Sequence, residues 1–90
     1  MKNRFKPGQL LIETDGSDCY LILGDCYYNS HCDDVSCNVY ELKYQKLNLF
    51  FLNNNDNTLI DIGPNPFTVL LTHHICCRIG HPIDQELKAY

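Results

Sequence analysis

The spacing of turn-forming residues limits this 90-residue chain to short secondary-structure elements. Pro-Gly occupies 7–8, Asp-Gly occupies 15–16, an Asn-rich run covers 53–57 and Pro-Asn-Pro occupies 64–66. These residues mark turns because Gly accepts positive φ, Pro fixes φ, and Asn and Asp bond to the nearby backbone. The segments between them are rich in Leu, Ile, Val, Tyr and Phe. Short strands separated by turns at this spacing are typical of a small all-β domain.

The first two strands are expected on either side of the Asp-Gly turn. Residues 9–14 and 19–24 are apolar segments that flank the stretch DGSD at 15–18, which is a strong hairpin signal. The second strand is open to extension as far as Tyr28, and its continuous apolar run predicts burial on both faces. The polar stretch 29–38 shows no periodicity and is predicted to be a loop.

The segment 39–52 leaves two interpretations open. Its apolar residues occupy even positions up to Tyr44 and odd positions from Leu47 onward. A strand cannot change face without a turn or a bulge, so two strands, or one sharply bent strand, are predicted with the change near 45–46. A helix also fits the spacing, but the aromatic content and the absence of Ala favour strands.

The last third of the chain is predicted to hold two strands and one helical turn. TLIDIG, 58–63, is a short strand, and the two prolines at 64 and 66 exclude a central strand there. Residues 67–79 place apolar side chains at alternate positions and are predicted to be a strand. Residues 83–90 form a helical turn with Asp84 as its N-cap.

These elements predict a single domain, residues 1–90, with an all-β fold. The expected architecture is a small barrel or roll of five or six short strands with a short C-terminal helical turn. Closing the sheet into a barrel removes edges that would otherwise pair with other chains. A hydrophobic content of 44% with 20% charged residues is ordinary for a globular domain.

Composition also bears on partners and location. No apolar run approaches the roughly 18 residues of a membrane-spanning helix, so no membrane partner is expected. A net charge of −4 without a basic patch argues against nucleic-acid binding. The opening MKNRFKPG contains no apolar stretch of the kind found in secretory signals. We therefore expect the protein in the cytoplasm of the cell that produces it.

Two stretches carry a family resemblance. FKPGQLLI, followed by CYLIL and later by IDIGPNPFTVLL, resembles small SH3-like barrel proteins, many of which are encoded by tailed bacteriophages. The matching segments, 5–12 and 62–71, cover under a quarter of the chain. The family usually closes with a strand such as GWV, where this chain has RIGHPID. The resemblance implies an SH3-like barrel that binds rather than catalyses, as a virion component, an accessory protein or a binder of a host protein.

The stretch THHICCRIGH, 72–81, concentrates His and Cys and suggests two further hypotheses. In a strand, His74 and Cys76 point the same way and offer two zinc ligands, whereas in a helix His73, Cys76 and Cys77 share a face. The polar loop supplies the second pair, either Cys32 with Cys37 or His31 with Cys37. A zinc-stabilised regulatory module is therefore one alternative. A cysteine-dependent enzyme is another, because a His near Cys76 could activate its thiol. The simplest interpretation has free thiols and no cofactor, with Cys19, Cys26 and Cys77 packed as small hydrophobes.

The tyrosines indicate where a partner would bind. Three of them, Tyr27, Tyr28 and Tyr40, are predicted to lie on an exposed face, and Tyr-rich faces of small barrels are used for protein contacts. The leading hypothesis is a non-enzymatic protein-binding or structural module. It would act through a protein partner or through self-assembly.

Overall fold

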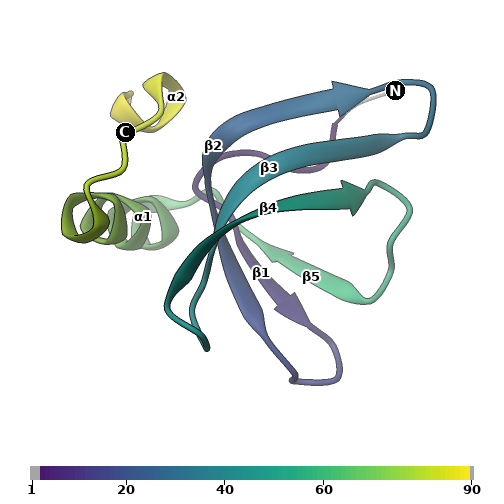
Figure 1. Cartoon of the computed structure of the whole chain (residues 1–90), viewed down its shortest axis with the longest axis horizontal. Helices are drawn as coiled ribbons and strands as arrows, with labels where there is room; N and C mark the ends of the chain where they lie inside the picture. Colours follow the sequence, from purple (N-terminus) through teal and green to yellow (C-terminus); the bar gives the residue numbers. More distant parts are fainter. Residues whose placement is uncertain (1–2, 90) are drawn as a thin grey trace.

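The computed structural model describes residues 3–89 as a strongly bent antiparallel sheet with a helix packed against one side (Figure 1). The strands are β1 (Leu10–Glu13), β2 (Cys19–Asn29), β3 (Asp34–Glu41), β4 (Lys46–Asn53) and β5 (Leu59–Ile62). The helices α1 (Pro66–Ile79) and α2 (Gln85–Lys88) follow them. Neither helix within the described residues is both long enough and apolar enough to cross a membrane.

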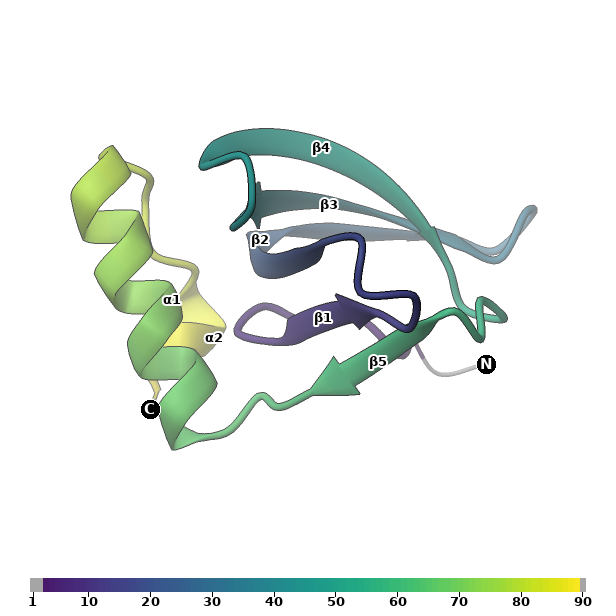
Figure 2. The same ribbon diagram turned by 90° about the horizontal axis from the view of Figure 1, so that it is seen from below.

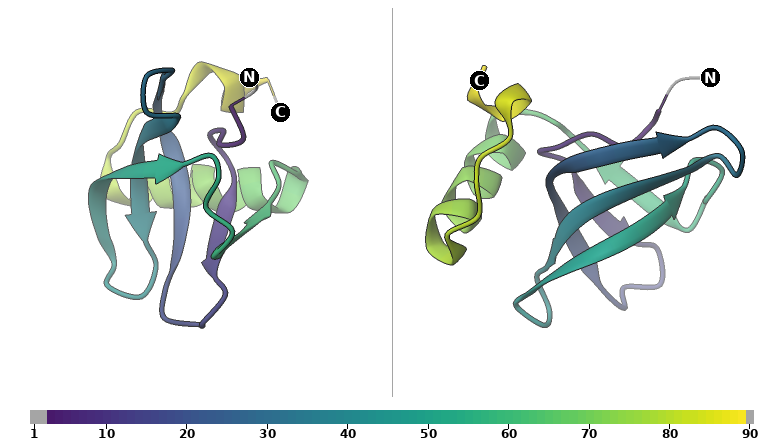
Figure 3. Two further views of the ribbon diagram at one scale, coloured as in Figure 1. Left: turned by 90° about the vertical axis from the view of Figure 1, so that its right-hand side faces the viewer. Right: turned by 45° about the horizontal axis from the view of Figure 1, so that its top comes forward.

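The five strands form one open sheet in the order β4-β3-β2-β1-β5. All four strand pairs are antiparallel, and β4 and β5 are the two edges. The views in Figure 3 show how the bent sheet brings its two halves to face each other. Of the predicted five or six strands the sheet contains five, and a mostly β fold with a short C-terminal helical turn is confirmed. An SH3-like barrel is not confirmed, since the sheet does not close.

Strand β2 changes direction in its middle, as Figure 1 shows. Two register shifts against β3 mark the place, between Ile22 and Gly24 and between Gly24 and Tyr27. Such bulges increase local twist and bend a sheet. The bend predicted near 45–46 is instead a turn over residues 42–45 that separates β3 from β4, so the two-strand interpretation of this region is confirmed.

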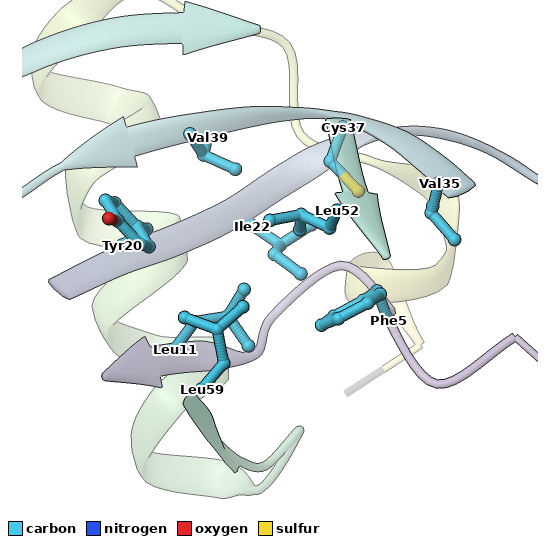
Figure 4. Packing of buried hydrophobic residues seen from close by; sticks show 9 residues of the cluster. All are labelled: Phe5, Leu11, Tyr20, Ile22, Val35, Cys37, Val39, Leu52 and Leu59. Atoms are coloured by element: carbon cyan, nitrogen blue, oxygen red, sulfur yellow. The ribbon is translucent and has the colours of Figure 1, made fainter. Parts of the chain in front are cut away.

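The main core lies between the facing halves of the bent sheet (Figure 4). Alternate residues of β3 point into it, and the ring of Tyr20 packs edge-on against Phe50 with centroids 4.8 Å apart. The buried members of this cluster come from the N-terminal segment and all five strands: Phe5, Leu11, Tyr20, Ile22, Val35, Cys37, Val39, Leu52 and Leu59.

A second, smaller core joins α1 to the other side of β2 (Figure 2). Leu21 and Leu23 of β2 are buried there against Ile75 and Cys76 of α1. Because Tyr20 and Ile22 are buried on the opposite side, the predicted burial of β2 on both faces is confirmed.

The strand predicted over 67–79 is wrong, because these residues form α1. The start of the helix is specified locally. The Asn65 side chain accepts a hydrogen bond from Thr68 N–H, and Thr68 Oγ1 accepts one from Asn65 N–H, both at 2.9 Å. Pro66 in the first turn and Gly80 in the left-handed region at the end of the helix add to this capping box. Together they favour a helix, although the short alternating pattern of apolar residues is typical of a strand.

The loop predicted over 29–38 is also too long. β2 continues to Asn29 and β3 begins at Asp34, so only 30–33 connects them. The buried residues of this strand are Val35, Cys37 and Val39, and they alternate with half-buried polar residues. The polar residues made the segment look like a loop, although its apolar residues repeat at every second position. The predicted helical turn is confirmed, since Asp84 caps α2 by accepting a hydrogen bond from Glu86 N–H at 2.9 Å.

Candidate interaction surface

The side of the sheet that faces away from the main core is only partly covered by α1. Beyond the helix, four large apolar side chains of β2 and β4 lie open to solvent on this side. Phe51, Leu49 and Leu47 of β4 are 71%, 52% and 50% exposed, and Tyr27 of β2 is 72% exposed. We call these four residues the β4 face. Tyr27 and Phe51 both lie opposite Ser36 of β3, one on each side, so they flank the same position.

The position of the β4 face follows from the alternation of a strand. Even-numbered residues of β4 turn inward, where Leu52 is buried and Phe50 is half-buried. Odd-numbered residues must therefore turn outward. The sequence identifies Leu47, Leu49 and Phe51 as one apolar face, but it does not say that the core lies on the other face.

A hollow of about 400 Å³ opens at one end of the β4 face. Tyr27 and Phe51 form its apolar part, and the polar part comes from Ser36, Asp34 and Asn29. Large aromatic side chains beside hydrogen-bonding groups are the usual composition of a protein contact site.

Backbone hydrogen bonds at both ends of β3 show which residues of β4 direct their N–H and C=O groups toward the open edge of the sheet. Leu42 N–H donates to the Cys19 carbonyl at 3.1 Å, so even-numbered residues of β3 bond to β2. Asn54 N–H donates to the Asp33 carbonyl at 3.1 Å, so even-numbered residues on the β4 side bond to β3. Because successive residues of a strand direct their N–H and C=O groups to opposite sides, odd-numbered residues of β4 direct theirs to the open edge.

The residues with outward apolar side chains are thus also those with edge-facing backbone groups. One bond supports this directly: Leu49 N–H donates to the neighbouring Asn48 Oδ1 at 2.9 Å rather than to β3. At Leu47, Leu49 and Phe51 the strand presents an apolar side chain together with backbone groups that face the open edge, where the Leu49 N–H is held only by the Asn48 side chain. That combination is what an added strand requires.

The three predicted contact tyrosines have different environments. Tyr27 belongs to the β4 face. Tyr28 is exposed, but its hydroxyl donates to Asp33 Oδ1 at 2.6 Å. Tyr40 is half-buried and packs against the small core beneath α1. The structure therefore places Tyr27 at the surface with Leu47, Leu49 and Phe51, which the sequence prediction did not select.

Asp33 connects the β2–β3 turn to the loop after β4. Besides the Tyr28 hydroxyl, its carboxylate accepts hydrogen bonds from Asn54 Nδ2 at 3.1 Å and Asn55 Nδ2 at 3.0 Å. The Tyr28 bond, followed by the Asn54 bond, lowers the pKa of Asp33. The Asn run of the sequence therefore fastens two loops beside the hollow.

The four predicted zinc ligands are not brought together. Cys37 is buried in the main core, whereas Cys76 is buried on the other side of β2 beneath α1. Cys32 is exposed in the β2–β3 turn, and His74 is exposed on α1. Within residues 3–89, no group of three or more His, Cys, Asp or Glu side chains is arranged to hold a metal ion.

His74 and Cys76 do not point the same way, because residues 67–79 form a helix and not the predicted strand. Two residues apart on a helix lie on nearly opposite sides, so His74 faces solvent while Cys76 faces β2. Burial, with a smaller contribution from neighbouring Cys77, raises the pKa of the Cys76 thiol. A nucleophilic cysteine requires the opposite shift.

The β4 face and the edge of β4 are therefore the part of the described structure best suited to contact another molecule. No family model, curated protein or solved structure matches this chain.

Proposed function

We propose that this protein is a non-enzymatic protein-binding module that adds a strand from its partner to the open edge of β4. The observation that carries the proposal is the coincidence at Leu47, Leu49 and Phe51 of exposed apolar side chains with edge-facing backbone groups. A strand added there gains main-chain hydrogen bonds and buries apolar surface in one step.

The edge of β4 lacks the usual protection. Proteins discourage unwanted pairing with short edge strands, bulges, Pro or several charges. β4 has eight residues that pair with β3 one to one without a register shift, and its sequence KLNLFFLN has a single charge and no Pro. The opposite edge, β5, has only four residues. An unprotected long edge supports a binding role for β4.

The partner we propose is a second copy of the same chain, paired through β4 in the antiparallel direction. With a two-fold axis at Leu49, each Leu49 lies opposite its copy and each Leu47 lies opposite Phe51. All three positions have edge-facing backbone groups, so the hydrogen bonds of both copies match once the Leu49 N–H exchanges Asn48 Oδ1 for the added strand. The apolar outer side chains also meet one another across the new pair.

The charge distribution supports pairing between copies. The chain has a net charge of −4, so most surfaces of two copies repel each other. β4 carries no Asp or Glu, and its one charged residue, Lys46, lies at the start of the strand. In the antiparallel arrangement the two Lys46 side chains lie at opposite ends of the interface.

Sedimentation velocity over a range of protein concentrations tests the proposal. We expect the unmodified protein to form dimers and Leu49→Pro to remain monomeric. Proline suits this test because Leu49 N–H points away from β3, so the substitution removes no bond between β3 and β4. Leu70→Lys is the matched control, since Leu70 is an exposed apolar residue on α1, and it should leave the dimer intact.

Two results would overturn this assignment. A protein that stays monomeric at every accessible concentration excludes pairing between copies. A dimer that persists in a folded Leu49→Pro variant places the interface elsewhere. Circular dichroism of each variant verifies the fold.

The sequence also suggests a biological setting and two other kinds of protein. That the module belongs to a bacteriophage, as a virion component or a binder of a host protein, stays a prediction. A zinc-stabilised module and a cysteine-dependent enzyme stay the alternatives to a binding module. The positions of His74, Cys76, Cys32 and Cys37 described above lend neither of them support.

A further inference from the structure

The second bulge of β2 places a cysteine opposite another cysteine. Gly24 pairs with Asn38 and Tyr27 pairs with Ser36, so Asp25 and Cys26 together oppose Cys37 alone. This two-against-one arrangement is the defining feature of a bulge.

The two bulge residues point in different directions. Asp25 is exposed, and its Oδ2 accepts a hydrogen bond from Asn38 Nδ2 at 2.8 Å. Cys26 instead packs against the main core that contains Cys37. The bulge register and this shared packing place the side chain of Cys26 beside that of Cys37. Both cysteines are free, so the fold holds an adjacent pair of thiols that are eleven positions apart in the sequence.

Solvent reaches this pair from one side. A hollow of about 290 Å³ is lined by Cys26 together with Phe5, Lys6, Pro7 and Glu86. Cys37 is fully buried behind it. A small reagent therefore meets Cys26 first and reaches Cys37 only through reaction at Cys26.

We propose that Cys26 and Cys37 form an intrachain disulfide when the protein meets a low-molecular-weight disulfide. The Cys26 thiolate attacks one sulfur of the reagent, whose S–S bond breaks as a mixed disulfide forms and one thiol leaves. The Cys37 thiolate then attacks the Cys26 sulfur, and the second thiol leaves. Two protein thiols are oxidised, the reagent is reduced to two thiols, and the two protons from the cysteines end on them.

The surroundings predict that this reaction is slow at neutral pH. The hydrogen bond to Cys37, followed by burial, raises the pKa of Cys26. The carboxylates of Asp84 and Glu86 raise it further, and Lys6 lines the same hollow. Because only the thiolate attacks, the rate should increase about tenfold for each pH unit while the pH stays below that pKa.

The test uses glutathione disulfide and a variant, Cys32→Ser/Cys77→Ser, in which the two exposed thiols are removed. After incubation near pH 9, we expect an intact mass reduced by two hydrogens, without a glutathione adduct. Chymotrypsin cleaves after Tyr27 and Tyr28, between the two cysteines, so a non-reducing digest should then contain a Cys26 peptide linked to a Cys37 peptide.

Two single variants in that background resolve the steps. Cys37→Ser should stop at a glutathione adduct on Cys26, and Cys26→Ser should show neither the adduct there nor the mass loss. The proposal is overturned if the parent variant accumulates glutathione on Cys26 while Cys37 remains a thiol. It is equally overturned if both cysteines are alkylated in full after oxidation and denaturation. The measurement is independent of strand pairing at β4, because it needs only the monomer.

Discussion

Arg4 and Asp61 form a two-pronged ion pair between residues that are 57 positions apart. The guanidinium donates to both carboxylate oxygens, from Nε at 2.6 Å and from Nη2 at 3.0 Å. Its other bonds go to backbone carbonyls of the β4–β5 loop and of β5, including Leu59 O at 3.0 Å. One side chain near the N-terminus thus holds the edge strand β5 and the preceding loop in place.

Replacing Arg4 by Ala is expected to lower the free energy of unfolding by roughly 2 kcal/mol, because several charge-assisted bonds are lost together. Arg4→Lys should recover only part of this loss, since an ammonium group cannot bind both carboxylate oxygens in one plane. Urea denaturation measures both effects. Lys6→Ala, at an exposed neighbouring side chain, should change stability by less than about 0.5 kcal/mol. Equal losses of unfolding free energy at Arg4 and Lys6 would contradict the role of Arg4 in holding β5.

Phe51 provides a second test of the β4 face. Phe51→Lys should weaken dimer formation at least about tenfold, because a tenfold change requires only about 1.4 kcal/mol and an aromatic contact exceeds that. Analytical ultracentrifugation measures the dissociation constant. Phe67→Lys on α1 removes an equally exposed ring from a different surface. If both substitutions weakened association to the same extent, the dimer contact would not be at the β4 face.

Asp33 should make stability depend on acid pH. Its folded pKa lies below that of an unfolded Asp, about 3.9, so its contribution is present above that value. The contribution is lost as the pH falls through the lower folded pKa, when the carboxylate is protonated. Asn tolerates the positive φ of this position, which is 54°. Asp33→Asn should therefore lower Tm at neutral pH and lose this effect near pH 2. A Tm difference that is constant with pH would exclude Asp33 as the source.

Gly63 should be essential for the start of α1. Its φ is +84°, and a Cβ built there would clash with Thr68 Oγ1, the hydroxyl that completes the capping box. Gly63→Ala is expected to cost roughly 2–4 kcal/mol from backbone strain and loss of the cap. Gly16→Ala is the matched control, because its φ is +76° but no atom lies within 4 Å of the added Cβ. Thermal unfolding should show a clearly larger decrease at Gly63, and equal decreases would rule out the steric explanation.

The sequence was sufficient for most of the features that short-range chemistry decides. The Asp-Gly turn, the break before β4 and the Asp84 cap depend on residues a few positions apart, and all three were predicted. The start of α1 is also local, since Asn65 and Thr68 form a capping box. It was missed because alternating apolar residues over 67–79 suggested a strand, although a short apolar run fits either element.

The interaction surface and the thiol pair depend on the tertiary structure. Alternation in β4 defines two faces. Only the register in which β4 pairs with β3 decides that Leu52 is buried and Phe51 is exposed, because a shift of one residue would exchange the two faces. The bulges in β2 likewise bring Cys26 to Cys37, and the path of the N-terminal segment brings Arg4 to Asp61. By itself the sequence determined the turns, the Asp84 cap and most of the strand-forming segments, whose forces act over a few residues. Only the tertiary structure decided which face is core, which edge is open and which distant side chains meet, because those outcomes depend on how the strands register against one another.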